Sequence, residues 1–142
     1  GVPLPDPSVI PDVPIFAARD GVVVDVRDGD DDHPPNYVPV ESDLPKGNRV
    51  RIVHSDGTYT LYTHLKKGSI VVAKGDTARG GSTKLGKMGN SGYSPNYHLH
   101  FEVEKVKRES NSVTGYQTLE FFFMGNDGTG FQPIEGNIYE RQ

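Results

Sequence analysis

The sequence has no cysteine, no tryptophan and no long apolar run. Without cysteine there are no disulfides, thiolate metal sites or cysteine nucleophiles, so a metal ion would have to be held by histidines and carboxylates. No segment approaches the ~18 apolar residues of a membrane-spanning helix, so we predict no membrane span. Only 34% of the 142 residues are hydrophobic, whereas 17 are glycine and 11 are proline. Glycine and proline interrupt strands and break helices, so much of the chain must be turns or loops. At 142 residues the chain is long enough for one domain and too short for two of ordinary size, so we predict one domain over 1–142.

Positive charge is also scarce, because 15 lysines and arginines face 19 acidic residues, for a net charge of -4. A nucleic-acid-binding domain usually presents a basic face, so we predict no nucleic-acid partner. Four aspartates gather within residues 28–32. They lack the ligand spacing and the glutamate of an EF-hand loop, so a solvated charge run is a better interpretation than a calcium site.

Short segments rich in Val, Ile, Thr and Tyr alternate with turn residues, the pattern of an antiparallel β-sandwich or meander. The clearest element is a hairpin, with strands at 50–54 and 58–65 around Ser55-Asp56-Gly57. The pattern of residues 15–26 predicts a strand, a turn and a second strand. A later strand is predicted at 117–124, before a turn at 126–128. Residues 27–47 predict a long surface loop. No window of ten or more residues has a helical period, so the predicted fold is all-β.

Two of the five histidines, His98 and His100, lie two residues apart in the segment YHLHFEV. On a strand they share one face, while Leu99 and Phe101 point into the opposite layer. Imidazoles ~7 Å apart on one face can serve one metal site. Taken alone, however, this pattern is more often two surface histidines. His54, just before the hairpin turn, is predicted to cap or pack there.

Four motifs occur in a regular order: VPIFAARDGVVV at 13–24, YTHL at 62–65, GKMGNSG at 86–92 and HLHFE at 98–102. Together they resemble the lysostaphin/LytM-like peptidoglycan metalloendopeptidases, peptidase family M23, over roughly residues 6–105. The resemblance implies that the core of the domain lies at about 6–105, followed by a C-terminal strand and tail at 106–142. The resemblance implies an antiparallel β fold of the duplicated hybrid motif kind, a zinc ion and peptidoglycan peptides as substrate. It also implies that the protein is secreted, periplasmic or in the cell envelope of a bacterium.

The resemblance further implies roles for individual residues. His100 and Asp6 would be zinc ligands, and His98 and His64 would flank the attacking water as general base and transition-state stabiliser. The 27–47 loop and the turn at 84–96 would flank the groove, and Tyr93 and Tyr97 would line it. A further ligand histidine would lie four residues before Asp6, where this chain has Val2.

This departure leaves several hypotheses open, because a catalytic zinc usually has three protein ligands and a water. The ligand histidine could lie upstream of residue 1, or His33 in the long loop could replace it. Otherwise the domain is a degenerate, zinc-free relative that binds peptidoglycan or an envelope partner protein as a scaffold. A carbohydrate-binding β-sandwich outside this family would leave the spaced motifs unexplained.

Overall fold

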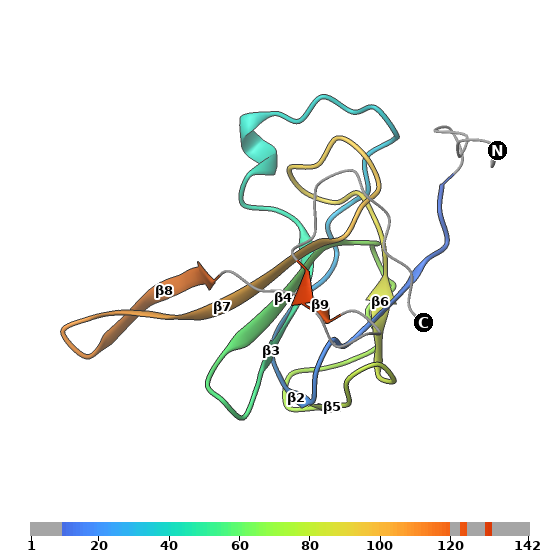
Figure 1. Cartoon of the computed structure of the whole chain (residues 1–142). Helices are drawn as coiled ribbons and strands as arrows, with labels where there is room; N and C mark the ends of the chain where they lie inside the picture. Colours follow the sequence, from blue (N-terminus) through green and yellow to red (C-terminus); the bar gives the residue numbers. More distant parts are fainter. Residues whose placement is uncertain (1–9, 120–122, 125–129, 132–142) are drawn as a thin grey trace.

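The computed structural model describes residues 10–119, 123–124 and 130–131 (Figure 1). These residues form short strands and one turn of 3-10 helix, so the predicted all-β fold is confirmed. None of their helical segments is long and apolar enough to cross a membrane. The strands are β1 (Pro14–Phe16), β2 (Gly21–Arg27), β3 (Asn48–Val53), β4 (Tyr59–Leu65), β5 (Thr77–Ala78), β6 (Lys84–Lys87), β7 (His100–Glu109), β8 (Ser112–Leu119), β9 (Phe123–Met124) and β10 (Gly130–Phe131), and the 3-10 turn is η1 (Glu41–Asp43).

The strands build one six-stranded antiparallel sheet and two small pairs. The large sheet has the order β5-β2-β3-β4-β7-β8, and its β3–β4 hairpin is the one predicted around residues 55–57. The predicted strand–turn–strand over 15–26 is also present, but its two strands do not pair: β1 crosses to β6, and β2 pairs with β3 and β5. The predicted turn at 126–128 lies outside the described residues.

The hydrophobic core lies between one face of the large sheet and the β1–β6 pair. Strand β3 shows why, because Asn48, Val50 and Ile52 are buried while the residues between them are not. Leu99 and Phe101 pack against this core, as their alternation with the histidines predicts, although both are only partly buried. The buried apolar residues are Ile15, Ala17, Val23, Val50, Ile52, Tyr62, Leu65, Ala78 and Leu85.

The opposite face of the large sheet is polar. Arg51 Nε donates to Glu104 Oε1 (3.0 Å), its NH1 group contacts Asp25 (3.3 Å), and its guanidinium lies 3.9 Å from the ring centre of Tyr116. Alternation along β7 places His100 and Glu102 on this same face as Glu104. Figure 1 shows that β7 and β8 continue as a hairpin beyond the rest of the sheet. The polar face is therefore the one that carries the histidine pair.

The long acidic loop, which begins after β2 and spans 28–47, is held to the body by its own aspartates. Asp32 accepts from the backbone amides of Asn90 (2.8 Å) and Lys67 (3.0 Å), and Asp30 accepts from that of Gly47 (2.8 Å). The interpretation of this stretch as solvated charge is thus wrong for Asp30 and Asp32, because carboxylates satisfy backbone donors that the turns leave free.

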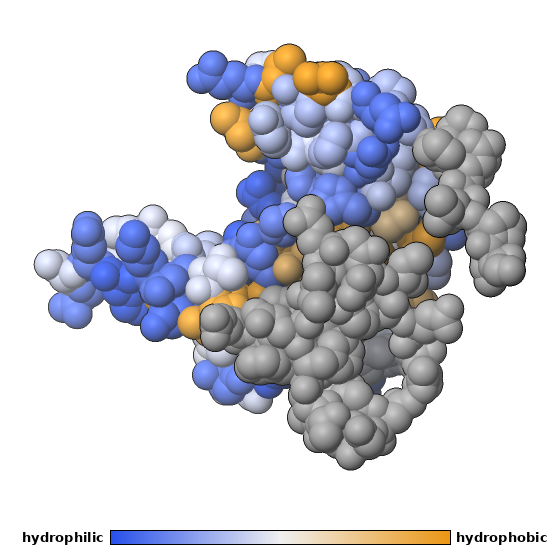
Figure 2. Space-filling model, turned by 45° about the horizontal axis from the view of Figure 1, so that its top comes forward, coloured by the Kyte–Doolittle hydropathy of each residue, from blue (hydrophilic) through white to orange (hydrophobic). Residues whose placement is uncertain are grey.

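On the face that Figure 2 shows, the surface of the described residues is mostly hydrophilic, with small separate apolar patches. Among the described residues, the most exposed large hydrophobic residue is Val38 in the 28–47 loop, at 78%. Scattered exposed apolar residues of this kind are normal on protein surfaces and do not define a site.

Candidate functional site

Three histidines that are distant in sequence converge at one end of the polar sheet face. One ring nitrogen from each of His64, His98 and His100 lies within 4.8 Å of the others. The ring centroids are 4.9 Å apart for His64 and His98, and 5.7 Å apart for His64 and His100. Among the residues that the structure describes, this is the one group of three or more metal-ligating side chains. The resemblance selected these same three histidines.

A β-bulge aims His64 at this group. The register between β3 and β4 shifts between Asn48 and Val50, so Thr63 and His64 together oppose one residue, Arg49. His64 has φ 61°, a left-handed conformation that non-glycine residues seldom adopt. Bulges of this kind redirect a side chain, and strained backbone of this kind is common at functional sites.

The bulge is held by buried hydrogen bonds to the 86–92 motif. The Nδ1 proton of His64 is donated to the carbonyl oxygen of Ser91 (2.7 Å). The Ser91 hydroxyl donates to the carbonyl oxygen of Leu65 (2.7 Å) and accepts from the backbone amide of Asn48 (3.0 Å). Burial lowers the pKa of His64, and the neighbouring His98 and His100 lower it further. The ring is therefore neutral at neutral pH.

His98 and His100 are also held through one ring nitrogen each. The Nδ1 proton of His98 is assigned to the carbonyl oxygen of Asn96 (2.8 Å), and the Nε2 proton of His100 to Oε1 of Glu102 (2.6 Å). These bonds leave Nε2 of His64, Nε2 of His98 and Nδ1 of His100 with free lone pairs. Metal-ligating and catalytic histidines are oriented in this way by an acceptor on their other nitrogen.

The donor set fits a zinc ion in kind. Zinc accepts imidazole nitrogens and carboxylate oxygens in a tetrahedral shell, and three imidazoles here each bring a ring nitrogen within 4.8 Å of the others. Asp6, the predicted second ligand, and Val2, which stands where a histidine is expected, both lie outside the described residues. The role of Asp6 therefore stays a prediction.

His33 does not join the group. Its Nε2 lies 3.3 Å from Oδ1 of Asp43, and its ring stacks on that of Tyr37 with centroids 3.8 Å apart. His33 therefore stabilises the 28–47 loop, and the hypothesis that it replaces the missing ligand is wrong in this structure.

His54 is buried at the β3–β4 hairpin. Its Nδ1 lies 2.7 Å from the Asp20 carbonyl oxygen, and its Nε2 lies 2.9 Å from the Thr60 hydroxyl. Its position agrees with the predicted packing role at the hairpin.

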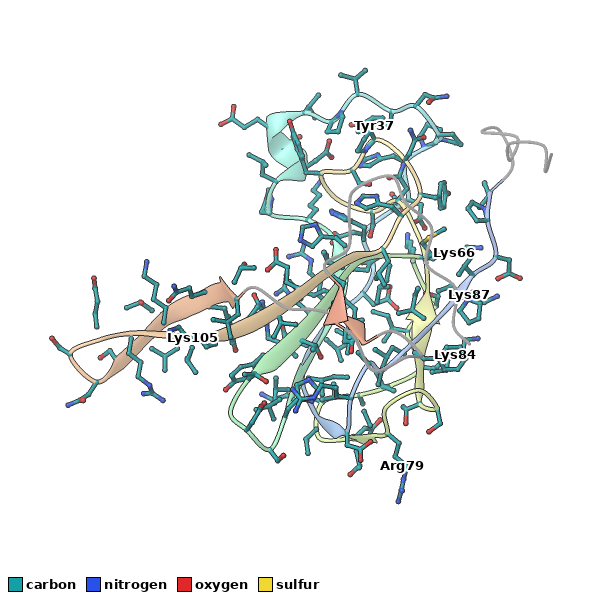
Figure 3. The ribbon with its side chains drawn as sticks, viewed as in Figure 1. Tyr37, Lys66, Arg79, Lys84, Lys87 and Lys105 are labelled. Atoms are coloured by element: carbon teal, nitrogen blue, oxygen red, sulfur yellow. The ribbon has the colours of Figure 1, made fainter. Side chains whose placement is uncertain are left out.

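The 28–47 loop and the 88–98 turn are joined to each other beside the histidines. The Tyr37 amide donates to the carbonyl oxygen of Pro95 (3.0 Å), and the Asn36 amide donates to Oδ1 of Asn96 (2.7 Å). The backbones of Asp32 and Ser91 also form an isolated antiparallel β-bridge. Figure 3 shows Tyr37 at this end of the molecule, far from Lys105 on the β7–β8 hairpin. The two segments that the resemblance predicts to flank the groove are therefore hydrogen-bonded directly to each other.

Sequence reasoning missed the residues that orient the histidines. Glu102 could have been found, because it shares a strand face with His100 at a spacing of two. Ser91 lies in the 86–92 motif, but no local pattern indicates its hydrogen bonds to His64 and Asn48, because these join residues 27 and 43 positions apart.

Comparison with known proteins identifies relatives for most of the chain. The sequence profile of peptidase family M23 matches residues 6–112. The peptidoglycan DD-endopeptidase ShyA of Vibrio cholerae is 37% identical over 100 residues, which is 70% of this chain and 19% of ShyA. An uncharacterized metalloprotease of Buchnera aphidicola is 34% identical over 98 residues, which is 69% of this chain and 22% of that protein. The chain thus spans about a fifth of these two relatives.

A solved structure shares the fold. The catalytic domain of the antimicrobial peptidase lysostaphin from Staphylococcus simulans superposes with a TM-score of 0.51 at 27% sequence identity. The match covers 75% of this chain and 67% of that one. Most of the six-stranded sheet and the motifs that supply the three histidines fall within the region that the family profile matches.

Proposed function

Because the chain belongs to peptidase family M23, we propose that it is a zinc-dependent endopeptidase domain that hydrolyses peptide bonds of bacterial peptidoglycan. The observation that supports this most directly is the convergence of three imidazoles, each with one ring nitrogen free and the other hydrogen-bonded to an acceptor. The name of ShyA, a peptidoglycan DD-endopeptidase, supports the substrate class. With this substrate, the domain would act in the periplasm or cell envelope of a bacterium, or as a secreted protein.

In this proposal each residue has a defined task. His100 and Asp6 would hold the zinc ion, which would supply Lewis acidity toward the scissile carbonyl and the attacking water. His98 is the general base: its Nε2 is free to accept a proton, because its Nδ1 proton is committed to Asn96. His64, whose ring is fixed by the bulge and by Ser91, would stabilise the transition state by accepting at its free Nε2 a hydrogen bond that orients the attacking water.

A second candidate function is binding without hydrolysis. Val2 stands where the resemblance implies a third ligand, and losing one strong ligand lowers zinc affinity sharply. The domain would then bind peptidoglycan, or a partner protein of the envelope, over the same polar sheet face.

One experiment separates the two functions. Purified peptidoglycan is incubated with the chain and added zinc, and released peptides and chain retained on the sacculi are both measured. The hydrolase proposal expects cleavage that a chelator stops and that His98→Ala and His100→Ala each abolish. Lys105→Ala on the distant hairpin serves as a folded control that cleaves normally. Retention on the sacculi with no cleavage at any zinc concentration would instead establish the binding function.

A further inference from the structure

The three histidines differ in what holds them, and this difference singles out His100. His64 and His98 are each bonded to a neutral backbone carbonyl, of Ser91 and Asn96. His100 is instead bonded to a carboxylate, Oε1 of Glu102, at 2.6 Å. A charge-assisted bond of this length is stronger than a neutral one, and it makes the imidazole a better electron donor.

Glu102 is itself held by a residue of β8, most of which lies beyond the region that the family profile matches. The Thr118 hydroxyl donates to Oε2 of Glu102 (3.2 Å). Thr118 lies on β8, which pairs along β7, whereas the family profile ends at residue 112. The nearby Glu104 cannot take the place of Glu102, because it is buried against Arg51 (3.0 Å).

We propose that Glu102, braced by Thr118 of β8, is a positioning residue that keeps the proton of His100 on Nε2 and turns its Nδ1 toward the metal position. This inference rests on the proposed function, because it concerns how this chain prepares its ligand. It assigns a task to β8: the strand completes the support of the site by holding the outer oxygen of the carboxylate. Neither Glu102 nor Thr118 contacts the reacting atoms.

The matched variants follow from the contacts. Glu102→Leu removes the acceptor, whereas Glu102→Gln keeps an oxygen that accepts from Nε2 but loses the charge. Thr118→Val removes the brace and Thr118→Ser restores its hydroxyl. Thr114→Val is the control on the same strand, because the Thr114 hydroxyl donates only to the Lys107 carbonyl oxygen (3.3 Å), away from the site.

Two measurements on the whole chain test the proposal. In the metal-free protein, the NMR resonance of the His100 Nε2 proton should be protected from exchange with water. We expect this resonance in the wild type and Glu102→Gln, and not in Glu102→Leu. In zinc titrations, Glu102→Leu should raise Kd by about 10- to 100-fold, the usual effect of losing a partner of a ligand histidine. The Kd of Glu102→Gln should lie between those of the wild type and Glu102→Leu. Thr118→Val should raise the Kd for zinc by less than Glu102→Leu does, and Thr118→Ser should keep the wild-type value. Thr114→Val should leave the Kd unchanged.

The outcomes separate this inference from the proposed function. A protected resonance and unchanged zinc affinity in folded Glu102→Leu would overturn the positioning role, whether or not the domain cleaves peptidoglycan. If the wild type binds no zinc, the metal-dependent function fails, and the resonance alone decides whether Glu102 orients His100. Equal thermal melting of the variants and the wild type excludes a merely structural effect.

Discussion

At the scale of single residues, the two faces of the large sheet have different roles: residues on one face pack in the core, and residues on the other form the candidate site. Phe101 and His98 illustrate this, because they lie three residues apart and serve opposite faces. Phe101 packs against the core, with its ring centroid 5.3 Å from that of Tyr62. His98 is exposed and contributes its ring nitrogens to the site.

Alanine substitutions should therefore separate stability from site chemistry. Phe101→Ala should lower the free energy of unfolding by about 2–3 kcal/mol, below the usual range for a fully buried phenylalanine because this ring is only partly buried. His98→Ala should change it by less than about 1 kcal/mol. Urea denaturation of both variants checks this, and a large loss on removing His98 would rule out its role as a site residue.

Asp56 gives a second test at this scale, at the turn of the β3–β4 hairpin. Hydrogen bonds from the Thr58 hydroxyl and amide lower the pKa of its carboxyl from 3.8 to about 2. A group whose pKa is depressed on folding stabilises the fold above its unfolded pKa, and loses this contribution as pH falls through the folded value. The contribution of Asp56 should thus be complete above about pH 4 and lost toward pH 2.

A carboxyl NMR titration checks this prediction, with the unfolding free energies of the wild type and Asp56→Asn compared across the same pH range. The two proteins should differ in stability at neutral pH and converge in acid. A carboxyl that titrates at its ordinary value would contradict the hydrogen bonds of the turn.

At the scale of elements, the 86–92 motif joins the strand that carries His64 to the long loop. Its glycines allow this close approach. A Cβ on Gly92 would lie 2.4 Å from the Lys46 carbonyl oxygen, and Gly92 has φ +78°. A Cβ on Gly89 would lie 2.4 Å from the Lys66 amide nitrogen. The backbone of the motif thus packs directly against the backbone of two other segments, which explains why it has glycine at positions 89 and 92.

Alanine at Gly92 should damage both stability and the site. The loss in free energy of unfolding combines two effects: alanine disfavours the left-handed conformation of residue 92, and its Cβ collides with the backbone of Lys46. Gly57→Ala isolates the first term, because Gly57 has φ +82° with nothing within 4 Å of the added Cβ. We expect Gly57→Ala to cost about 1–2 kcal/mol and Gly92→Ala clearly more, measured by chemical denaturation. Only Gly92→Ala should also weaken zinc binding, since Ser91 moves with it. Equal losses of unfolding free energy in the two variants would show that the backbone around Gly92 can move to accommodate the Cβ, and would contradict this prediction.

At the scale of the whole molecule, zinc binding decides between the two functions. This chain offers His100 and Asp6 as predicted ligands, and Val2 cannot supply a third. We therefore expect the purified chain to hold well under one zinc per molecule. Stabilisation by a ligand follows RT ln(1 + [L]/Kd), so added zinc should raise the melting temperature only slightly.

Metal analysis and thermal melting with and without zinc provide the measurement. Tightly held, stoichiometric zinc would overturn this ligand count and would make His64 and His98 the first residues to test as additional ligands, because they already face His100.

The sequence by itself determined the fold class, the β3–β4 hairpin and the histidines of the candidate site. Turn chemistry and a period of two are local properties, and the spaced motifs lie within short segments. The tertiary structure alone decided that β1 pairs with β6, that a bulge turns His64 toward His98 and His100, and that Asp30 and Asp32 cap backbone amides. These features depend on hydrogen bonds between residues far apart in the chain. Local pattern cannot encode such contacts, because they form only when the sheet brings distant segments together.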